Sequence, residues 1–148
     1  MHSIYNTPLA MATRAAIILA ARSSQTREEK VITAIDLLAT HAQHYGLGDL
    51  NLHGDVEKPS IELAARTHHM KQGIKFAVLH GLLTPKVEAR QLRYSLAHQG
   101  ERFLEQIETY YRDQYEHQLS AVLAYIDTHT YDQVFNFITR MDIQGDLS

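Results

Sequence analysis

The stretch from Ser60 to Ala97 constrains the fold of this chain more than any other. A single long helix is predicted from Ile61 to His80, because apolar residues recur there at helical spacing and Gly81 provides a stop. A hairpin of two short strands and a connecting turn is predicted next, at Leu82–Val87, Leu92–Leu96 and Glu88–Gln91. A helix followed by a hairpin is the core of a winged helix, in which the hairpin is the wing.

The same stretch is basic, although the chain as a whole is acidic. Six lysines and arginines stand against two glutamates there, a net charge of +4, whereas the whole chain has a net charge of −3. A local basic patch is suited to phosphate groups or to an acidic protein. The candidate residues for binding nucleic acid or an acidic partner are Arg66, Lys71, Lys75, Lys86, Arg90 and Arg93.

Two further helices are predicted before this stretch. The first runs from Pro8 to Arg22, with Thr7 as its cap, and it is apolar on most sides, as a central helix is. The second runs from Arg27 to Tyr45 and opens with a capping box at Thr26–Glu29. A polar loop then leads to Ser60, which is predicted to cap the third helix.

The remaining residues are predicted to form a helical tail. Apolar residues step by three and four from Phe103 to Ile126, and a second capping box at Thr130–Gln133 opens a last helix that ends near Met141. The predicted fold class is therefore mainly α. A winged-helix domain of three helices plus a β-hairpin wing occupies residues 1–97, and a C-terminal helical extension, residues 98–148, packs on it and on partners.

Composition excludes several classes of protein. The chain has no cysteine, so disulfides, thiol catalysis and cysteine-based zinc sites are impossible. The segment Met1–Tyr5 lacks the basic start of a signal peptide. The apolar run Leu9–Ala21 is shorter than the roughly 20 residues that a membrane span requires. We expect no membrane association and a cytoplasmic location.

Ten histidines raise the hypothesis of a metal site. His41 and His44 lie three residues apart on one helix face, and zinc accepts three imidazoles with a carboxylate. The other candidate ligands are His53, Asp55, His68 and His69. Adjacent residues point about 100° apart on a helix, and no HExxH-type pattern is present, so scattered surface histidines are the preferred interpretation. Motifs for nucleophiles and for phosphate binding are absent as well. We expect no enzyme, no catalytic residue, no metal and no cofactor.

The predicted third helix is poorly suited to recognising DNA bases. A DNA-reading helix-turn-helix joins its helices through three or four residues, whereas the fourteen residues 46–59 separate the second and third helices here. Few side chains of the helix are suited to base edges. A solvated or protein-binding face is therefore preferred, and contact with double-stranded DNA is left open.

The tail is rich in tyrosine, a residue enriched at protein interfaces. Tyr110, Tyr111 and Tyr115 span too wide an arc for one inward stripe, and acidic residues surround them. We expect the tail and the apolar first helix to contact partners. The candidate protein-interface residues are Tyr5, Leu9, Tyr110, Tyr111 and Tyr115.

A series of short motifs carries a family resemblance over about residues 5–110. They follow one another in the family's order: Tyr5-Asn6-Thr7-Pro8-Leu9, Leu37-Leu38, Leu52-His53-Gly54, Glu62-Leu63-Ala64-Ala65-Arg66, Gly73-Ile74, Gly81-Leu82-Leu83, Leu92-Arg93-Tyr94 and Phe103-Leu104. In this order the chain resembles the middle component of ABC-three-component systems, the small subunit of Lamassu-type bacterial defence complexes.

The resemblance implies a non-catalytic subunit. Its partners would be an SMC-like ABC ATPase and an effector, often a nuclease, which it would help to hold inactive until foreign DNA is sensed. The alternative is a stand-alone dimeric winged-helix transcriptional regulator, and a histidine metalloenzyme is a third class.

Overall fold

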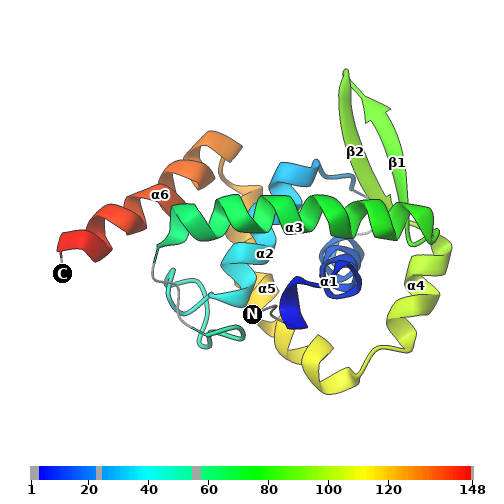
Figure 1. Cartoon of the computed structure of the whole chain (residues 1–148), viewed down its shortest axis with the longest axis horizontal. Helices are drawn as coiled ribbons and strands as arrows, with labels where there is room; N and C mark the ends of the chain where they lie inside the picture. Colours follow the sequence, from blue (N-terminus) through cyan, green and yellow to red (C-terminus); the bar gives the residue numbers. More distant parts are fainter. Residues whose placement is uncertain (1–3, 23–24, 55–57, 148) are drawn as a thin grey trace.

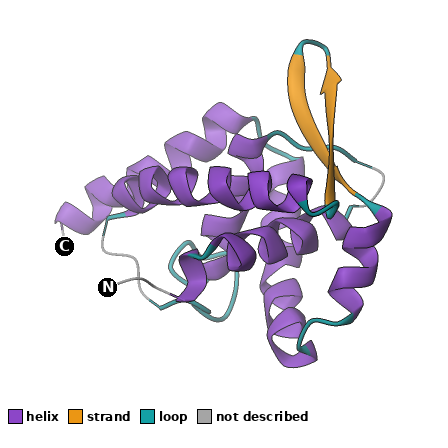
Figure 2. Cartoon of the chain, turned by 45° about the vertical axis from the view of Figure 1, so that its right-hand side comes forward, coloured by secondary structure: helices purple, strands orange, loops and turns teal. Residues whose placement is uncertain are grey.

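The chain folds into helices and one small antiparallel hairpin (Figures 1 and 2). The computed structural model describes residues 4–22, 25–54 and 58–147, with backbone only for residues 141–147. Its elements in chain order are η1 Ile4–Asn6, α1 Pro8–Ala20, α2 Glu29–Thr40, α3 Pro59–Leu79, β1 Leu83–Glu88, β2 Gln91–Leu96, α4 His98–Glu105, α5 Thr109–Asp127 and α6 Tyr131–Leu147. None of the helices in these ranges is both long and apolar enough to cross a bilayer.

Helix α1 lies at the centre, as its apolar sequence predicts. The Thr7 hydroxyl accepts a hydrogen bond from the Ala10 N–H at 3.1 Å, which confirms the predicted cap. Helix α3 crosses α1 at Gly73, where a β-carbon would collide with Met11 and the Ala12 backbone. The glycine therefore permits the close approach of the two helices, at the expense of helix propensity.

The end of α3 is a Schellman motif at Gly81, the residue predicted to stop the helix. Gly81 has a φ of +72°, a conformation that glycine adopts without a steric penalty. The Leu82 N–H donates to the Ala77 carbonyl at 2.8 Å, and the Gly81 N–H donates to the Val78 carbonyl at 3.1 Å. This motif turns the chain out of α3 and into the hairpin, which rises from that end of the helix (Figure 1).

The hairpin is joined to the start of α2. Strands β1 and β2 pair in a register in which Pro85 is opposite Tyr94 and Lys86 is opposite Arg93. On the other side of β2, Tyr94 forms an isolated bridge with Arg27, with backbone hydrogen bonds of 3.0 and 2.8 Å. Residue 27 thus supplies a minimal third strand between α1 and α2.

This junction overturns the prediction of a capping box at Thr26–Glu29. Helix α2 begins at Glu29, and its N-cap, Glu28, makes no side-chain cap bond. The Thr26 hydroxyl instead accepts from Arg93 Nε at 2.8 Å and donates to Glu88 at 3.2 Å. The prediction was wrong because contacts with the hairpin compete for the hydroxyl. The helix also ends at Thr40, five residues before the predicted Tyr45.

The tail completes the core. The predicted capping box at Thr130–Gln133 is confirmed by reciprocal bonds of 2.8 and 3.2 Å. Helices α4 and α5 are separate, because the Glu108 carboxylate caps a new helix at the N–H groups of Tyr110 and Tyr111. Buried residues of α5 join those of α1 and α2 in one cluster: Tyr115, Leu119, Val122, Leu123 and Ile126. Helix α5 therefore packs on α1 and α2.

Candidate partner-binding surfaces

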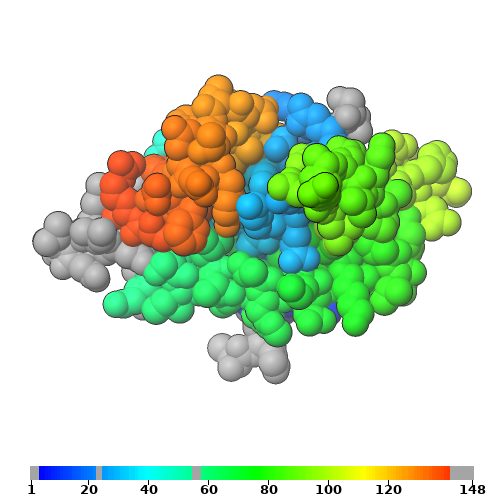
Figure 3. All heavy atoms as spheres, turned by 90° about the horizontal axis from the view of Figure 1, so that it is seen from above, coloured from blue at the N-terminus to red at the C-terminus, as the bar shows by residue number. Residues whose placement is uncertain are grey.

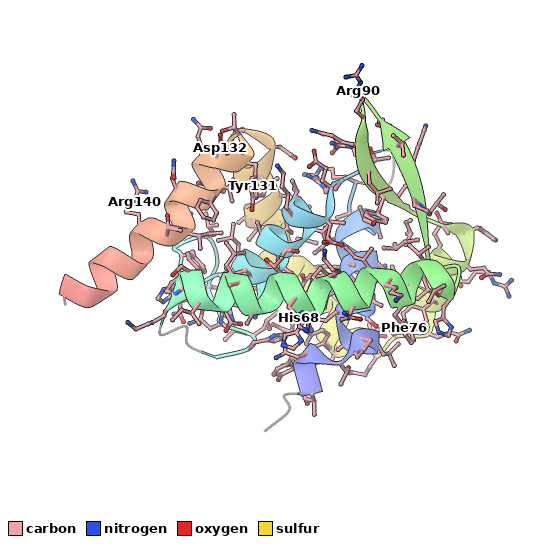
Figure 4. All side chains as sticks on the ribbon, turned by 45° about the horizontal axis from the view of Figure 1, so that its top comes forward. His68, Phe76, Arg90, Tyr131, Asp132 and Arg140 are labelled. Atoms are coloured by element: carbon pink, nitrogen blue, oxygen red, sulfur yellow. The ribbon has the colours of Figure 1, made fainter. Side chains whose placement is uncertain are left out.

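Four of the predicted basic residues are exposed on α3 and the hairpin. They are Lys71, Lys75, Lys86 and Arg90, which we term the basic surface. Arg90 lies at the tip of the hairpin and points away from the body (Figure 4). Lys86 lies 3.7 Å from Glu88, whereas no described side chain forms an ion pair with the other three. These three charges are available to a partner.

The hairpin tip holds a strained turn. Ala89 and Arg90 have φ angles of 51° and 67°, the signs of a type I′ turn, which favours asparagine and glycine. A left-handed residue with a β-carbon costs roughly 1–2 kcal/mol. The turn therefore presents Arg90 at some expense in stability.

Arg93 holds the hairpin in place rather than standing free. Its guanidinium donates to the Thr26 hydroxyl at 2.8 Å and to the Thr26 carbonyl at 2.7 Å. It also lies 3.4 Å from Glu28 and 3.9 Å from Glu88. The half-buried Arg93 therefore fixes the angle between the hairpin and the start of α2.

Arg66 was predicted to belong to the basic patch, and this prediction was wrong. The residue is only 4% exposed. Its guanidinium donates to the Thr40 hydroxyl, to the Asp36 carbonyl at 3.1 Å and to Glu62 at 2.7 Å. The residue faces α2 because a carboxylate buried there requires compensating positive charge.

That carboxylate, Asp36, is the centre of a buried ionic cluster. Arg14 donates to both of its oxygens, at 2.8 and 3.1 Å, and Arg66 Nη1 lies 3.4 Å from one of them. Burial alone would raise the pKa of Asp36, but the charges of Arg14 and Arg66 hold it well below its usual range. We term Arg14, Asp36, Arg66 and Tyr115 the buried ionic cluster. It links α1, α2, α3 and α5.

Tyr115 was predicted at a protein interface, and this prediction was also wrong. The side chain is fully buried, and its hydroxyl donates to Asp36 at 2.6 Å. Burial, together with the Asp36 charge, raises the pKa of Tyr115 well above its ordinary value. The wide arc of tyrosines exists because this ring points inward to the carboxylate while Tyr110, 71% exposed, points out.

Two neutral histidines lie over the cluster. His41 Nδ1 lies 2.6 Å from the Gly54 carbonyl and must carry the proton, so its Nε2 can accept from Arg66 at 3.3 Å. Burial lowers the pKa of His41. Burial and the Arg14 charge lower the pKa of His53 to about 3. Both rings are therefore uncharged at neutral pH, so they add no positive charge beside Arg14 and Arg66.

The candidate metal ligands do not come together. Across the described ranges, no three His, Cys, Asp or Glu side chains are grouped as metal ligands would be. The rings of His41 and His53 lie 6.3 Å apart, while His44 packs against Tyr45. Asp55 lies outside the described residues.

Three of the predicted interface residues meet around one hollow. Tyr5, Leu9 and Tyr111 line a cavity of about 300 Å³, although α5 and the N-terminal segment are distant in sequence. The Tyr5 ring stacks on His53 at 3.7 Å, and the Tyr111 hydroxyl bonds to His53 at 2.8 Å. Leu9 is 51% exposed at the rim. We term this the tyrosine hollow; Tyr110 is not among its lining residues.

Sequence reasoning missed Arg14 and Asp36, although a signal was present. Arg14 is the one charged residue of α1, and Asp36 is the one charged residue of α2 after its first turn, with the opposite sign. A charge at such a position is rarely buried unless it is paired. Two lone opposite charges on two core helices therefore indicate an internal ion pair.

The family is shown by a match that spans nearly the whole chain. The model of the family described as "ABC-three component (ABC-3C) system Middle Component 2" matches residues 4–144. No curated protein and no solved structure matches the chain. The matched range runs from η1 through most of α6, so it includes the basic surface, the buried ionic cluster and the tyrosine hollow. The chain therefore belongs to the Middle Component 2 family of ABC-three component systems.

Proposed function

We propose that this protein is a non-catalytic accessory subunit of a Lamassu-type bacterial defence complex. It binds the heads of an SMC-like ABC ATPase and helps to restrain an effector nuclease until foreign DNA is sensed. The observation that carries the proposal is the family match over residues 4–144, since a middle component works with protein partners.

The arrangement of polar groups supports a role in binding rather than catalysis. The charges inside the protein bond to one another: Asp36 accepts from Arg14, Arg66 and Tyr115. Their role in the fold is to join four helices. The charges that a partner can reach lie outside, on the basic surface, and the tyrosine hollow opens beside the exposed Leu9.

The chain topology supports the proposed winged-helix core. A winged helix has a short strand between its first two helices, and this strand pairs with the second strand of the wing. The bridge of Arg27 with Tyr94 occupies that position, between α1 and α2 and against β2. The long third helix, α3, then leads directly into the hairpin.

Co-expression with the ATPase and effector subunits encoded beside this protein tests the proposal. We expect a stable complex on gel filtration, with low nuclease activity until foreign DNA is added. A complex that forms equally well without this subunit, and that is equally silent, would contradict it.

The proposed winged-helix core also supports a second candidate, the transcriptional regulator. A regulator would purify alone as a symmetric dimer. It would protect a palindromic duplex whose half-sites lie about one helical turn apart. The proposed subunit would bind such duplexes poorly on its own.

A further inference from the structure

A groove runs between α3 and the hairpin. Its cavity measures about 280 Å³, large enough for roughly one or two apolar side chains. The lining residues come from the start of α2, from one face of α3 and from both strands: Glu29, Lys71, Ile74, Lys75, Val78, Leu79, Pro85 and Tyr94. The hairpin projects above the helices in Figure 1 and lies beside α3 when the molecule is viewed from above in Figure 3. Exposed residues such as Leu79 line the cavity, so a partner can reach it.

The face of α3 in the groove combines apolar and basic residues. Its members recur at steps of three and four, as residues on one face of a helix do: Lys71, Ile74, Lys75, Val78 and Leu79. Leu79 is 74% exposed, an unusual exposure for a large apolar side chain beside a cavity. His68 and Phe76 lie along the other edge of α3 (Figure 4).

The hairpin contributes a second apolar wall. Side chains alternate between the two faces of a strand, so Val87 lies on the same face as Pro85, and Leu92 on the same face as Tyr94. Val87 and Leu92 are directly opposite each other in the register, and they are 70% and 51% exposed. The apolar wall therefore extends from the cavity almost to the tip of the hairpin.

The charges beside this apolar surface favour an acidic partner. Lys71 and Lys75 are exposed, and neither is ion-paired to a described side chain. Glu29 is the one acidic side chain among the described residues of the lining. A segment that presents carboxylates along α3 would pair with both lysines while its apolar side chains enter the groove.

The geometry points to an acidic amphipathic helix of a partner subunit as the occupant of this groove. Its apolar residues, at helical spacing, would fill the cavity and cover Leu79, Val87 and Leu92, and its flanking aspartates or glutamates would face Lys71 and Lys75. The inference rests on the proposed function, because it names the chemistry by which a partner subunit is held.

A helix fits better than an added strand. The backbone of Tyr94 bonds outward to Arg27, so its partner Pro85 is a residue whose backbone faces the opposite, free edge of β1. A proline has no N–H, so the middle of this edge lacks a donor. An extended peptide would meet that gap, whereas a helix uses only side chains.

Matched glutamate variants test the inference in the co-expressed complex. Leu79→Glu places a charge in the groove, and Ile61→Glu places one on the same helix outside the groove lining, at a residue that is 63% exposed. We expect Leu79→Glu, and the pair Lys71→Glu with Lys75→Glu, to weaken partner binding by about tenfold or more. Ile61→Glu should bind like the unmodified protein. Circular dichroism and melting curves show that each variant is folded.

The results separate this inference from the proposed function. If the unmodified protein co-purifies with its partners and the three groove substitutions leave the affinity unchanged, the inference fails while the proposed function stands. If the unmodified protein binds no partner subunit at all, the proposed function fails and takes the inference with it.

A photo-crosslinking amino acid at position 79 identifies the occupant. In the assembled complex, the crosslinked peptide should come from a partner subunit and should carry more aspartate and glutamate than lysine and arginine. Crosslinks to DNA, to a basic segment, or to a second copy of this chain would each overturn the inference.

Discussion

The positively charged residues of α3 lie in two different environments, one buried and one exposed to solvent. Arg66 is buried and donates to Asp36, Thr40 and Glu62, whereas Lys71 and Lys75, less than three turns further on, are exposed and unpaired with any described side chain. The arginine belongs to a network that joins four helices. The lysines belong to a surface that a partner can reach.

The difference teaches that net charge along a stretch does not define a binding patch. An arginine suits the interior because its planar fork satisfies several acceptors at once, while a lysine is a strongly hydrated point charge on a flexible stem. A helix with one face in the core separates the two by position. Four predictions test this contrast, from the largest expected effect to the smallest.

The largest effect is expected at the centre of the buried ionic cluster. Asp36→Ala leaves Arg14 and Arg66 buried without their shared anion, and we expect a loss of about 3–5 kcal/mol in the free energy of unfolding, measured by urea denaturation. Asp113→Ala, at an exposed carboxylate of α5, should change it by less than about 0.5 kcal/mol. Equal effects at the two positions would remove the distinction between the cluster and the surface.

Mild acid should lower the free energy of unfolding through the two histidines beside the buried ionic cluster. The pKa of His53 is about 3 in the folded protein, below its ordinary value of 6.5, so the unfolded chain takes up a proton first as the pH falls. The contribution of His53 to the free energy of unfolding is complete above pH 6.5, and about 1–2 kcal/mol of it should be lost by pH 5. The pKa of His41 is also lowered and adds a loss of the same sign. Asp36 contributes only as the pH falls through its ordinary pKa of 3.8 and below.

Urea titrations at pH 7 and pH 5 measure this loss. His53→Gln should flatten the dependence, leaving the part that His41 contributes. If stability is the same at both pH values in the unmodified protein, His53 is not held neutral by its surroundings.

The hairpin tip should gain stability when its turn is given suitable residues. Ala89→Asn with Arg90→Gly matches the positive φ angles at both positions, and we expect an increase of about 1 kcal/mol in the free energy of unfolding. Ala89→Val should lower it instead, because a β-branched residue resists that conformation. A lower melting temperature for the Asn-Gly variant would show that the Arg90 side chain stabilises the fold.

The smallest effect on stability is expected at the basic surface. Lys71→Glu with Lys75→Glu should change the free energy of unfolding by less than about 0.5 kcal/mol, because both side chains are exposed. Arg66→Met, on the same helix, should cost several times more. A loss above about 1 kcal/mol in the lysine variant would place those residues in the fold rather than on a binding surface.

Several features set by neighbouring residues could be predicted from the sequence. Gly81 ends α3, Thr7 caps α1, and Thr130 and Gln133 cap α6, since each depends on contacts within a few residues. The predicted Ser60 cap was wrong, because α3 begins at Pro59 and its N-cap, Lys58, makes no side-chain cap bond. Thr26 shows the limit of local reasoning. Its capping motif is intact in sequence, but Arg93, 67 residues away, takes the hydroxyl.

The candidate site follows the same division. The exposed members of the basic surface could be predicted because lysine on an outward helix face is the ordinary case. The burial of Arg66 and Tyr115 could not, since it depends on Asp36, 30 and 79 residues away in the chain. Arginine and tyrosine are also common on protein surfaces. Only the three-dimensional arrangement of the helices therefore shows that Arg66 and Tyr115 are buried.

The shared core has a consequence for how the chain reaches its native state during synthesis. The carboxylate of Asp36 receives its tyrosine hydroxyl from residue 115, and the apolar cluster closes with Val134 and Ile138. When only the residues up to the hairpin have been synthesised, Asp36 lies among Arg14 and Arg66 without the hydrogen bond from Tyr115. The apolar face that α5 and α6 cover in the folded protein is then exposed to solvent. The native core must therefore wait until α6 has been translated.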